Sequence, residues 1–253
     1  MRLTVVGCSG SYPGPDSPAS CYLLQADHNG RTYSLVMDLG NGALGALQRY
    51  VDLADVDAVA LSHLHVDHCI DLTSYYVVRT YRPEGPLPAL PVHAPPGASA
   101  RVAAASGFAD RSGVDQVFDF HEWEPERSVQ LGPFTVTSTR VRHPVEAYAM
   151  RIEQDGRALV YSGDSGPTPA LAALAGNADL FVCEASFLEG ADNPPDMHLT
   201  GGDAGRHAAS GDVRRLLLTH IPPWHDADRV LVEARSEFSG PIELARPGAV
   251  HTV

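Results

Sequence analysis

The stretch HLHVDH at residues 63–68 places three histidines and one aspartate within six residues. It directly follows the apolar run Asp57–Leu61, which predicts a buried strand. Because alternate side chains of an extended chain point the same way, His63 and His65 can face one ion together. Asp67 and His68 lie where the chain turns toward a helix, so they can face a second ion. Imidazole and carboxylate groups together suit zinc, manganese or iron, so the stretch predicts a metal site.

Further ligands must come from elsewhere in the chain, because two adjacent ions need roughly seven or eight protein ligands. Three candidates each follow a strand-like run: His143, Asp164 in Tyr-Ser-Gly-Asp-Ser, and His220 after Leu-Leu-Leu-Thr. Loops that follow strands are where α/β proteins place their chemistry. Each residue alone is equally well explained by an ordinary structural role. Together with residues 63–68 they complete the ligand set of a two-metal site.

Composition and charge limit the class of protein. The chain has 253 residues, of which 44% are hydrophobic and 19% charged, as in ordinary globular proteins. We expect one domain over residues 1–253. The formal net charge is −13, and no run of arginine or lysine stands out, which argues against a surface that grips a nucleic-acid backbone. A small anionic substrate remains compatible, because bound divalent cations reverse the charge locally.

The cysteines and the apolar runs bear on the compartment. Four cysteines are scattered without a CxxC pair, at positions 8, 21, 69 and 183. The first residues read as a strand rather than a secretory signal. No apolar run approaches the roughly 20 residues of a membrane-spanning helix. These features predict a cytoplasmic protein with free thiols and no membrane contact.

The periodicity predicts strands and helices in two halves. The expected strands are Arg2–Gly7, Cys21–Ala26, Thr32–Met37, Asp57–Leu61, Leu90–His93, Gln116–Trp123, Phe134–Val141, Tyr148–Glu153, Arg157–Tyr161, Leu180–Cys183 and Val213–Leu218. The expected helices are Gly42–Tyr50, Ile70–Tyr81, Pro169–Ala175, Thr200–Ser210 and Asp226–Phe238. This order predicts an α/β fold of packed sheets covered by helices.

The ordered motifs resemble those of the metallo-β-lactamase superfamily over nearly the whole chain. These motifs are His-x-His-x-Asp-His, a later histidine, Ser-Gly-Asp and a final Thr-His. In addition, Met-Asp-Leu-Gly around Asp38 resembles the first motif of that family, in which an acid orients the metal loop. The resemblance implies an αββα four-layer sandwich with two divalent ions at one edge, zinc first, with manganese or iron as alternatives. It implies that His63, His65 and His143 hold one ion, that Asp67, His68 and His220 hold the other, and that Asp164 bridges them.

Two later segments resemble the ribonuclease Z-like branch of the superfamily. The segment 183–187, Cys-Glu-Ala-Ser-Phe, resembles its His/Cys-Glu-Ala-Thr-Phe, and the segment 197–200, Met-His-Leu-Thr, resembles its His-Ser-Thr. In that branch the additional histidine is the proton donor and the glutamate orients it, which implies these roles for His198 and Glu184. Imidazole can supply the proton that a departing alkoxide needs near neutral pH. The plain alternative is that both residues serve only as supporting hydrogen-bond or helix-cap residues.

The spacing between two motifs argues against a tRNA substrate. True ribonuclease Z enzymes insert a long basic arm between the third histidine and the Ser-Gly-Asp motif. Here His143 and Asp164 are 21 positions apart, and two short predicted strands with an Asp155-Gly156 turn fill the interval. The acidic net charge points the same way. We therefore expect no tRNA partner.

A narrower resemblance suggests the substrate. Gly7–Ser11, His143–Tyr148 and Thr219–Trp224 resemble an actinobacterial group of cytosolic proteins that includes atypical cyclic-nucleotide phosphodiesterases. This implies a phosphodiesterase that converts a small phosphodiester such as cAMP to its 5′-monophosphate, with Asp67 accepting the proton of the attacking water. The alternatives are hydrolysis of RNA 3′ ends, thioesters, lactones or aryl sulfates, or a ligand-binding scaffold without activity. A homodimer is compatible with this branch.

Some aromatic residues near the motifs could stack a nucleotide base. They are Tyr75, Tyr76, Tyr148 and Trp224. Packing in the core or at an interface is the more common use of such residues. The glycine-containing segment Gly7–Ser11 could also offer backbone N–H groups to a phosphate, although a lone glycine loop is a weak signal.

Overall fold

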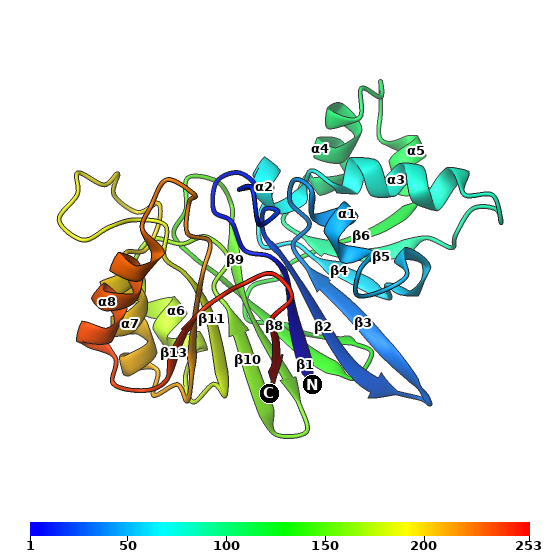
Figure 1. Cartoon of the computed structure of the whole chain (residues 1–253). Helices are drawn as coiled ribbons and strands as arrows, with labels where there is room; N and C mark the ends of the chain where they lie inside the picture. Colours follow the sequence, from blue (N-terminus) through cyan, green and yellow to red (C-terminus); the bar gives the residue numbers. More distant parts are fainter.

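Two seven-stranded sheets face each other in the computed structural model, which describes all residues, 1–253 (Figure 1). The first sheet has the order β14 (Val250–Thr252), β1 (Arg2–Gly7), β2 (Cys21–His28), β3 (Arg31–Met37), β4 (Ala58–Ala60), β5 (Leu90–Ala94) and β6 (Phe118–Glu122). The second has the order β13 (Ile242–Leu244), β12 (Leu216–Thr219), β11 (Leu180–Glu184), β10 (Arg157–Tyr161), β9 (Tyr148–Gln154), β8 (Phe134–Arg140) and β7 (Ser128–Leu131).

Helices cover the outer face of each sheet. Beside the first sheet lie α1 (Ala43–Leu47), the 3₁₀ turn Leu53–Asp55, α2 (Val66–Cys69), α3 (Leu72–Tyr81), α4 (Ala98–Ala105) and α5 (Ser112–Asp115). Beside the second lie α6 (Pro169–Leu174), α7 (Gly201–Ser210) and α8 (Ala227–Glu237). The layers confirm the predicted αββα sandwich. None of the helices combines the length and the apolar character that crossing a bilayer requires.

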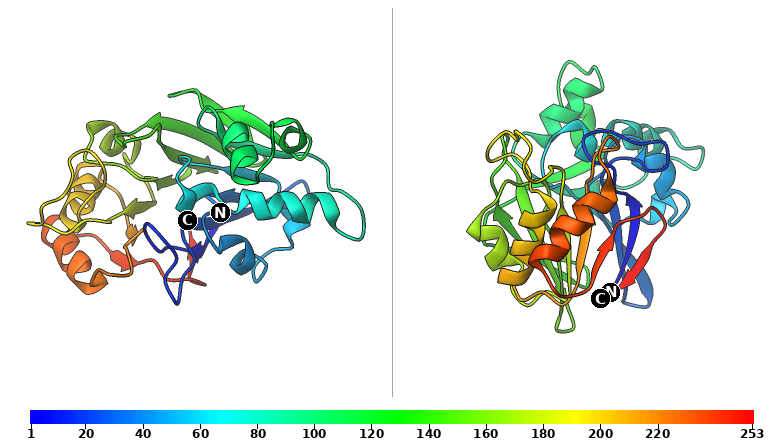
Figure 2. Two further views of the ribbon diagram at one scale, coloured as in Figure 1. Left: turned by 90° about the horizontal axis from the view of Figure 1, so that it is seen from above. Right: turned by 60° about the vertical axis from the view of Figure 1, so that its left-hand side comes forward.

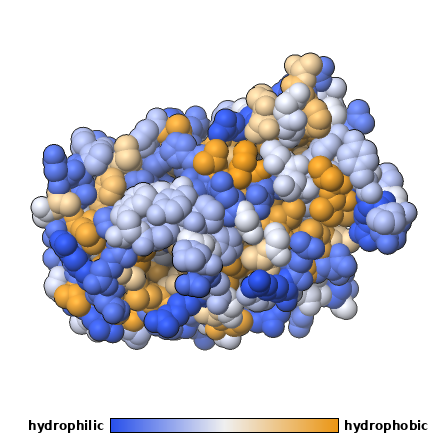
Figure 3. Space-filling model, turned by 45° about the horizontal axis from the view of Figure 1, so that its top comes forward, coloured by the Kyte–Doolittle hydropathy of each residue, from blue (hydrophilic) through white to orange (hydrophobic).

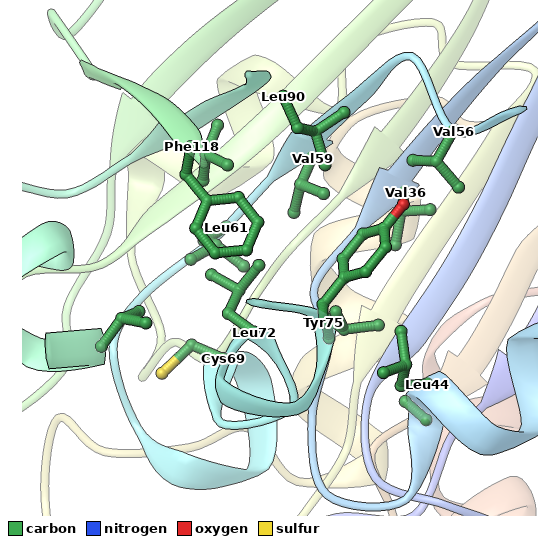
Figure 4. Packing of buried hydrophobic residues seen from close by; sticks show 14 of the residues in the cluster. Val36, Leu44, Val56, Val59, Leu61, Cys69, Leu72, Tyr75, Leu90 and Phe118 are labelled. Atoms are coloured by element: carbon green, nitrogen blue, oxygen red, sulfur yellow. The ribbon is translucent and has the colours of Figure 1, made fainter. Parts of the chain in front are cut away.

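Three apolar clusters fill the spaces between these layers. The cluster between the sheets has 20 buried residues. The cluster between the first sheet and its helices has 24, and the cluster between the second sheet and its helices has 19. Every layer is therefore packed against its neighbour through an apolar core. On the first sheet, Tyr75 and Phe118 lie among aliphatic side chains of the strands, with Cys69 close by (Figure 4). Cys69 is buried there as a small apolar residue, as expected for a free thiol.

Two tight hairpins fix the antiparallel parts of the sheets. The β2–β3 turn has Asn29 and Gly30 at φ 50° and 80°, and the β9–β10 turn has Asp155 and Gly156 at φ 50° and 73°. Positive φ at both central residues suits the right-handed twist of a hairpin, and asparagine, aspartate and glycine tolerate it best. The predicted Asp155-Gly156 turn is therefore confirmed, and β9–β10 occupies most of the interval between His143 and Asp164.

The parallel strands determine where the functional residues meet. β3 and β4 run parallel in one sheet, and β10, β11 and β12 run parallel in the other. Their carboxyl ends reach the same edge of the sandwich, at the top of Figure 1, where the loops between layers are seen from above in Figure 2. The two termini lie side by side at the opposite edge because β14 pairs with β1 (Figure 2).

Several elements differ from the sequence prediction. The predicted helix Ile70–Tyr81 begins at Leu72, and the short helix α2 precedes it within the histidine motif. Helices α4 and α5 and the strands β7, β13 and β14 were not predicted. The alanine-rich segment 98–105 has a strong helix propensity that could have revealed α4, whereas three- and four-residue strands are too short to show an alternating pattern.

Candidate metal centre

The predicted site residues lie at the edge where the parallel strands end. The loops after β4, β8, β10 and β12 carry His63, His143, Asp164 and His220 respectively. A space-filling view with this edge turned forward shows hydrophilic and hydrophobic side chains interspersed, without one continuous apolar surface (Figure 3). The sandwich thus places side chains that are far apart in sequence beside one another at its rim.

The histidine motif divides its side chains between two positions. His65 is extended, with φ −67° and ψ 155°, and the helix α2 begins directly after it. The turn of this helix brings the His68 ring beside that of His63, with centroids 4.1 Å apart, while Asp67 and His68 contribute to a different group of candidate ligands from His63 and His65. His63 and His68 are fully buried, and Asp67 is 6% exposed. The change from extended chain to helix therefore assigns the four residues to two groups of candidate ligands.

The first group of candidate ligands is His63, His65, His143 and Asp164. Nδ1 of His65 lies 3.0 Å from Nε2 of His63 and 3.1 Å from Nε2 of His143. One ligand atom from each residue lies within 4.8 Å of all the others. Three imidazole nitrogens and a carboxylate oxygen thus converge on one small volume.

The second group is Asp67, His68, Asp164 and His220. Nε2 of His220 lies 3.1 Å from Nε2 of His68 and 3.1 Å from Oδ2 of Asp67. Asp164 belongs to both groups, and it is 2% exposed. Its position between the groups is that of a bridging carboxylate.

The chemistry of these groups fits divalent metal ions. Oδ1 of Asp164 is buried and accepts no hydrogen bond from the protein, an arrangement that is costly unless a cation satisfies it. Nitrogen and oxygen donors in groups of four suit zinc, manganese or iron. In each group, ring nitrogens and carboxylate oxygens lie close together with too few hydrogen atoms for all of them to form hydrogen bonds. One bound cation can interact with all of these atoms at once. That these seven residues bind metal remains a prediction.

Neighbouring groups fix the orientation of the candidate histidine ligands. Nδ1 of His143 lies 2.8 Å from the carbonyl of Met197, and Nδ1 of His220 lies 2.8 Å from the hydroxyl of Ser186. A hydrogen bond at one ring nitrogen leaves the other free as a ligand and sets the plane of the ring. Sequence reasoning missed these partners, since serine and a backbone carbonyl carry no recognisable metal motif.

Asp38 connects the histidine motif to both sheets. Its φ is 55°, a left-handed conformation that aspartate tolerates, and the residue is fully buried. Its carboxylate accepts from Ser62 N at 2.7 Å and from Tyr161 Oη at 2.7 Å, and it lies 2.7 Å from Nδ1 of His68. These contacts support the predicted role of Asp38 in orienting the metal loop.

Burial and the neighbouring charges shift the pKa values of the candidate ligands in opposite directions. Burial lowers the pKa of His63 well below its ordinary value, and the neighbouring His68 lowers it further. Burial alone would lower the pKa of His68, but the carboxylates of Asp164 and Asp38 overcome it and raise that pKa. Burial alone would raise the pKa of Asp164, but His220, His68 and His63 lower it well below the ordinary value. These histidines therefore favour the ionised form of the Asp164 carboxylate, which is the form in which a carboxylate binds metal.

Glu184 and His198 form a pair beside the two ligand groups. Oε1 of Glu184 lies 3.0 Å from Nδ1 of His198, and Glu184 is fully buried at the end of β11. The Glu184 carboxylate also accepts from Ser165 N at 2.8 Å and from Ser186 N at 3.2 Å. Burial alone would lower the pKa of His198, but Glu184 overcomes it and raises that pKa to about 9. Glu184 thus fixes the position of the imidazole and favours its protonated form.

The aromatic residues near the motifs are placed differently from one another. Tyr148 and Tyr75 are buried in apolar clusters, so neither can stack a ligand at the site. Tyr76 packs against Phe108 on the helical side of the first sheet. Only Trp224 among the four is well exposed, at 61%. For Tyr75 and Tyr148 the packing alternative is therefore correct.

Backbone contacts join the first loop to the last candidate ligand. The amide of Ser11 donates to Nε2 of His220 at 3.4 Å, and Gly10 N donates to the carbonyl of Ile221 at 3.2 Å. The segment Gly7–Ser11 therefore borders the site, where the sequence suggested that its amides could face a ligand. The structure places one of these amides beside a candidate metal ligand.

Known proteins resemble this chain in sequence and in fold. A family described as the beta-lactamase superfamily domain matches residues 33–221. An uncharacterized protein of Mycobacterium tuberculosis is 46% identical over 245 residues, covering 96% of this chain and 88% of that protein. The metallo-beta-lactamase fold protein YhfI from Bacillus subtilis is 31% identical, and its crystal structure superposes with a TM-score of 0.86 over 99% of both chains.

Ribonuclease Z proteins are further relatives. Ribonuclease Z of Myxococcus xanthus is 26% identical over 302 residues, covering 98% of this chain and 96% of that protein. The short form of human tRNase Z, 20% identical, has the same fold with a TM-score of 0.77 and covers 100% of this chain and 99% of its own. The chain therefore belongs to the metallo-β-lactamase superfamily, in its ribonuclease Z-like branch, and is a metal-dependent hydrolase.

Proposed function

We propose that this protein is a phosphodiesterase that hydrolyses a 3′,5′-cyclic nucleotide, with cAMP as the leading candidate, to the 5′-monophosphate. The observation that carries the proposal is the pair of Glu184 and His198 beside the two ligand groups. A thioester expels a thiolate, which leaves readily without a proton donor, whereas the ribose alkoxide that departs from a cyclic nucleotide is a poor leaving group unless it is protonated. A protonated imidazole held beside the departing oxygen can supply the proton that this oxygen requires.

Two ions, which we propose are zinc, would be held by the two ligand groups described above. His63, His65, His143 and Asp164 would hold one, and Asp67, His68, Asp164 and His220 would hold the other. When bound, such ions lower the pKa of a coordinated water and neutralise charge that develops on the phosphate oxygens. Manganese or iron would satisfy the same nitrogen and oxygen donors.

The protein side chains account for the two proton transfers. A bond forms from the water oxygen to phosphorus while the bond from phosphorus to O3′ breaks. The Nε2 proton of His198 passes to O3′, since Nδ1 is engaged by Glu184. Asp67, whose Oδ2 faces His220, accepts the proton that the attacking water loses. The products are the 5′-monophosphate and an enzyme that regains its starting state by moving one proton from Asp67 to His198.

The size and charge of the chain favour a small substrate over tRNA. The interval between His143 and Asp164 holds the β9–β10 hairpin, so no room remains there for a tRNA-binding arm. All 18 basic residues are arginines, against 31 acidic residues, and they form no long basic track in the sequence. A nucleic-acid backbone would be repelled over most of this surface.

The state of the cysteines and the ribonuclease Z-like resemblance support two further proposals, on the compartment and on the oligomeric state. We propose that it acts in the reducing cytoplasm, because all four cysteines are free and three of them are buried.

We also propose that it can form a homodimer, as the ribonuclease Z-like resemblance suggests. Light scattering of the purified protein gives the mass directly, and a monomer at all concentrations would refute the dimer.

Turnover of a substrate panel by metal-loaded protein tests the proposed function. The panel contains cyclic AMP, other cyclic nucleotides, bis-p-nitrophenyl phosphate, an RNA 3′ end, a thioester and a lactone. We expect hydrolysis of the phosphodiesters, with a cyclic nucleotide as the best substrate. Preference for the thioester or lactone would refute the phosphodiesterase. Protein that binds no metal and stays inactive after zinc or manganese is added would favour the scaffold alternative.

A further inference from the structure

A cavity of about 300 Å³ opens beside His198. It lies between the segment around Arg142 and the loop from Phe187 to His198, which projects at the upper left of Figure 1. Asn193 and Asp196 belong to its walls. None of the seven candidate metal ligands lines it, so the cavity adjoins the centre without being part of it.

We propose that this cavity holds the nucleoside part of the substrate. The inference rests on the proposed function and deepens it. In-line displacement at phosphorus puts the attacking and departing oxygens on opposite sides. His198 protonates the departing O3′, so O3′ must lie next to His198. Because O3′ is an atom of the ribose, the sugar and its base must lie on the same side as His198, where the cavity is.

The walls of the cavity offer both apolar and polar contacts. The Phe187 ring meets the His198 ring edge to face, with centroids 5.0 Å apart and planes at 84°, and it is partly exposed. Asn193 donates from Nδ2 to the carbonyl of Leu188 at 2.9 Å, and its Oδ1 accepts no hydrogen bond from the protein. A ring surface beside a free amide oxygen matches a nucleoside, which has an aromatic face and N–H or O–H donors at its edges.

Arg142 adds a cationic group to the same cavity. Its Nη1 donates to Oδ1 of Asp196 at 3.1 Å, and its other N–H groups make no hydrogen bond within the protein. The side chain is 57% exposed, so this ion pair contributes little to stability. The guanidinium is therefore available to a ligand, by hydrogen bonds to ribose hydroxyls or by stacking on a base.

A second aromatic surface borders the centre on another side. Tyr12 and Trp224 are 40% and 61% exposed, with ring centroids 5.1 Å apart. The amide of Ser11 contacts His220, which places this pair near that ligand rather than in the cavity. A base stacked on Trp224 is thus the main competing arrangement, and it serves as an outcome of the test.

The test compares two cyclic diesters as competitive inhibitors of bis-p-nitrophenyl phosphate hydrolysis by the metal-loaded protein. Cyclic AMP carries the nucleoside, whereas trimethylene phosphate has the same six-membered cyclic diester without sugar or base. The variant is Arg142→Ala combined with Asn193→Ala. The matched control is Arg140→Ala, which removes the same charge from an arginine that is 63% exposed and does not line the cavity. Calorimetric binding gives the same comparison if the aryl ester is not hydrolysed.

We expect the inhibition constant of cyclic AMP to rise at least about tenfold in the double variant and to stay within about twofold in Arg140→Ala. We expect the constant of trimethylene phosphate to stay within about twofold in both, with bound metal unchanged. The cavity assignment would be overturned if the inhibition constant of cyclic AMP were unchanged in the double variant, or if both probes bound equally more weakly to it. It would also be overturned if cyclic AMP bound more weakly only to a Trp224→Ala variant, which tests the competing arrangement. Absence of any inhibition by cyclic AMP in the unmodified protein would also overturn it. Cyclic AMP that binds as predicted but is not hydrolysed would instead refute the proposed function alone.

Discussion

At the scale of single residues, Asp38 shows how one buried carboxylate can organise a metal loop. It accepts hydrogen bonds from the first residue of the loop and from the end of β10, and it contacts His68. It therefore joins both sheets at the point where the candidate ligands converge. A hydrogen-bonded carboxylate behind a histidine ligand makes that imidazole a better donor and fixes its tautomer.

Asp38→Asn should weaken metal binding while preserving the fold. Asparagine tolerates a φ of 55°, but it loses the negative charge that His68 faces. A residue that hydrogen-bonds a metal-binding histidine typically contributes a factor of about 10–100 to metal affinity. Competition with a chelator of known affinity measures the change. Asp27→Asn, at an exposed position of β2, is the control, and equal metal affinity in both variants would contradict the role of Asp38.

His198→Ala should slow phosphodiester hydrolysis and leave bound metal intact. Loss of a positioned general acid typically costs a factor of about 10²–10⁴ in turnover. Glu184→Gln should reproduce part of this loss, because the amide keeps the hydrogen bond to His198 but removes the charge that keeps it protonated. Turnover of cyclic AMP with metal content measured in parallel checks both. A fully metallated His198→Ala protein with an unchanged rate would remove His198 from the mechanism.

The sequence predicts the charged residues of the site far better than their supporting contacts. His63 to His68, His143, Asp164 and His220 stand in recognisable motifs, and the fold brings all of them together. The hydroxyl of Ser186 and the carbonyl of Met197 orient two of these histidines, yet neither position carries a signal in the sequence. Such contacts depend on tertiary packing, since the atoms come from separate strands and loops.

At the scale of elements, close approach between loops constrains the site. Gly40 follows β3 and lies against Asp67 of α2, within the histidine motif. A Cβ atom there would overlap the carbonyl oxygen of Asp67, which is backbone and cannot simply rotate away. Gly45, in α1, has nothing within 4 Å of the position of a Cβ. The two glycines form a natural pair for comparison.

Gly40→Ala should displace the metal loop, whereas Gly45→Ala should not. Overpacking typically costs about 1–3 kcal/mol, and here the strain falls on the segment that holds Asp67. Alanine in the interior of a helix instead gains up to about 1 kcal/mol over glycine. Denaturant unfolding and metal content of the two variants measure these effects. A Gly40→Ala protein with normal stability and normal metal content would show that the loop can shift without loss.

The predicted elements also differ in how well sequence reveals them. Strands that lie in the middle of a sheet, such as β11 and β12, are fully buried and read as continuous apolar runs. The short edge strands β13 and β14 have no such pattern, because only their pairing with β12 and β1 makes them strands. Tertiary pairing, rather than local propensity, decides these segments.

At the scale of the whole molecule, we propose that residues 1–253 form one domain. The cluster between the sheets combines residues of both halves, from Leu3 to Leu217, so neither sheet has a complete core alone. The metal ligands likewise come from both halves of the chain. Folding of the two sheets and formation of the metal centre should therefore be coupled.

Removal of metal should destabilise the whole protein in one cooperative transition. An ion present at 1,000 times its dissociation constant contributes about 4 kcal/mol per site. For a chain of this size, loss of such binding should lower the melting temperature by roughly 10 °C or more. Calorimetry before and after chelation, followed by readdition of zinc, measures the shift and its reversal. Two separate transitions, or a melting temperature that chelation leaves unchanged, would contradict the coupling.

Hydrolysis of cyclic AMP in ¹⁸O-labelled water by protein that holds two metal ions tests the central claim most directly. Phosphorus NMR identifies both the product and the position of the label. We predict 5′-AMP with one ¹⁸O atom in its phosphate, because water attacks phosphorus and the bond to O3′ breaks. No turnover by the metal-loaded protein, or a 3′-monophosphate as the product, would contradict the account.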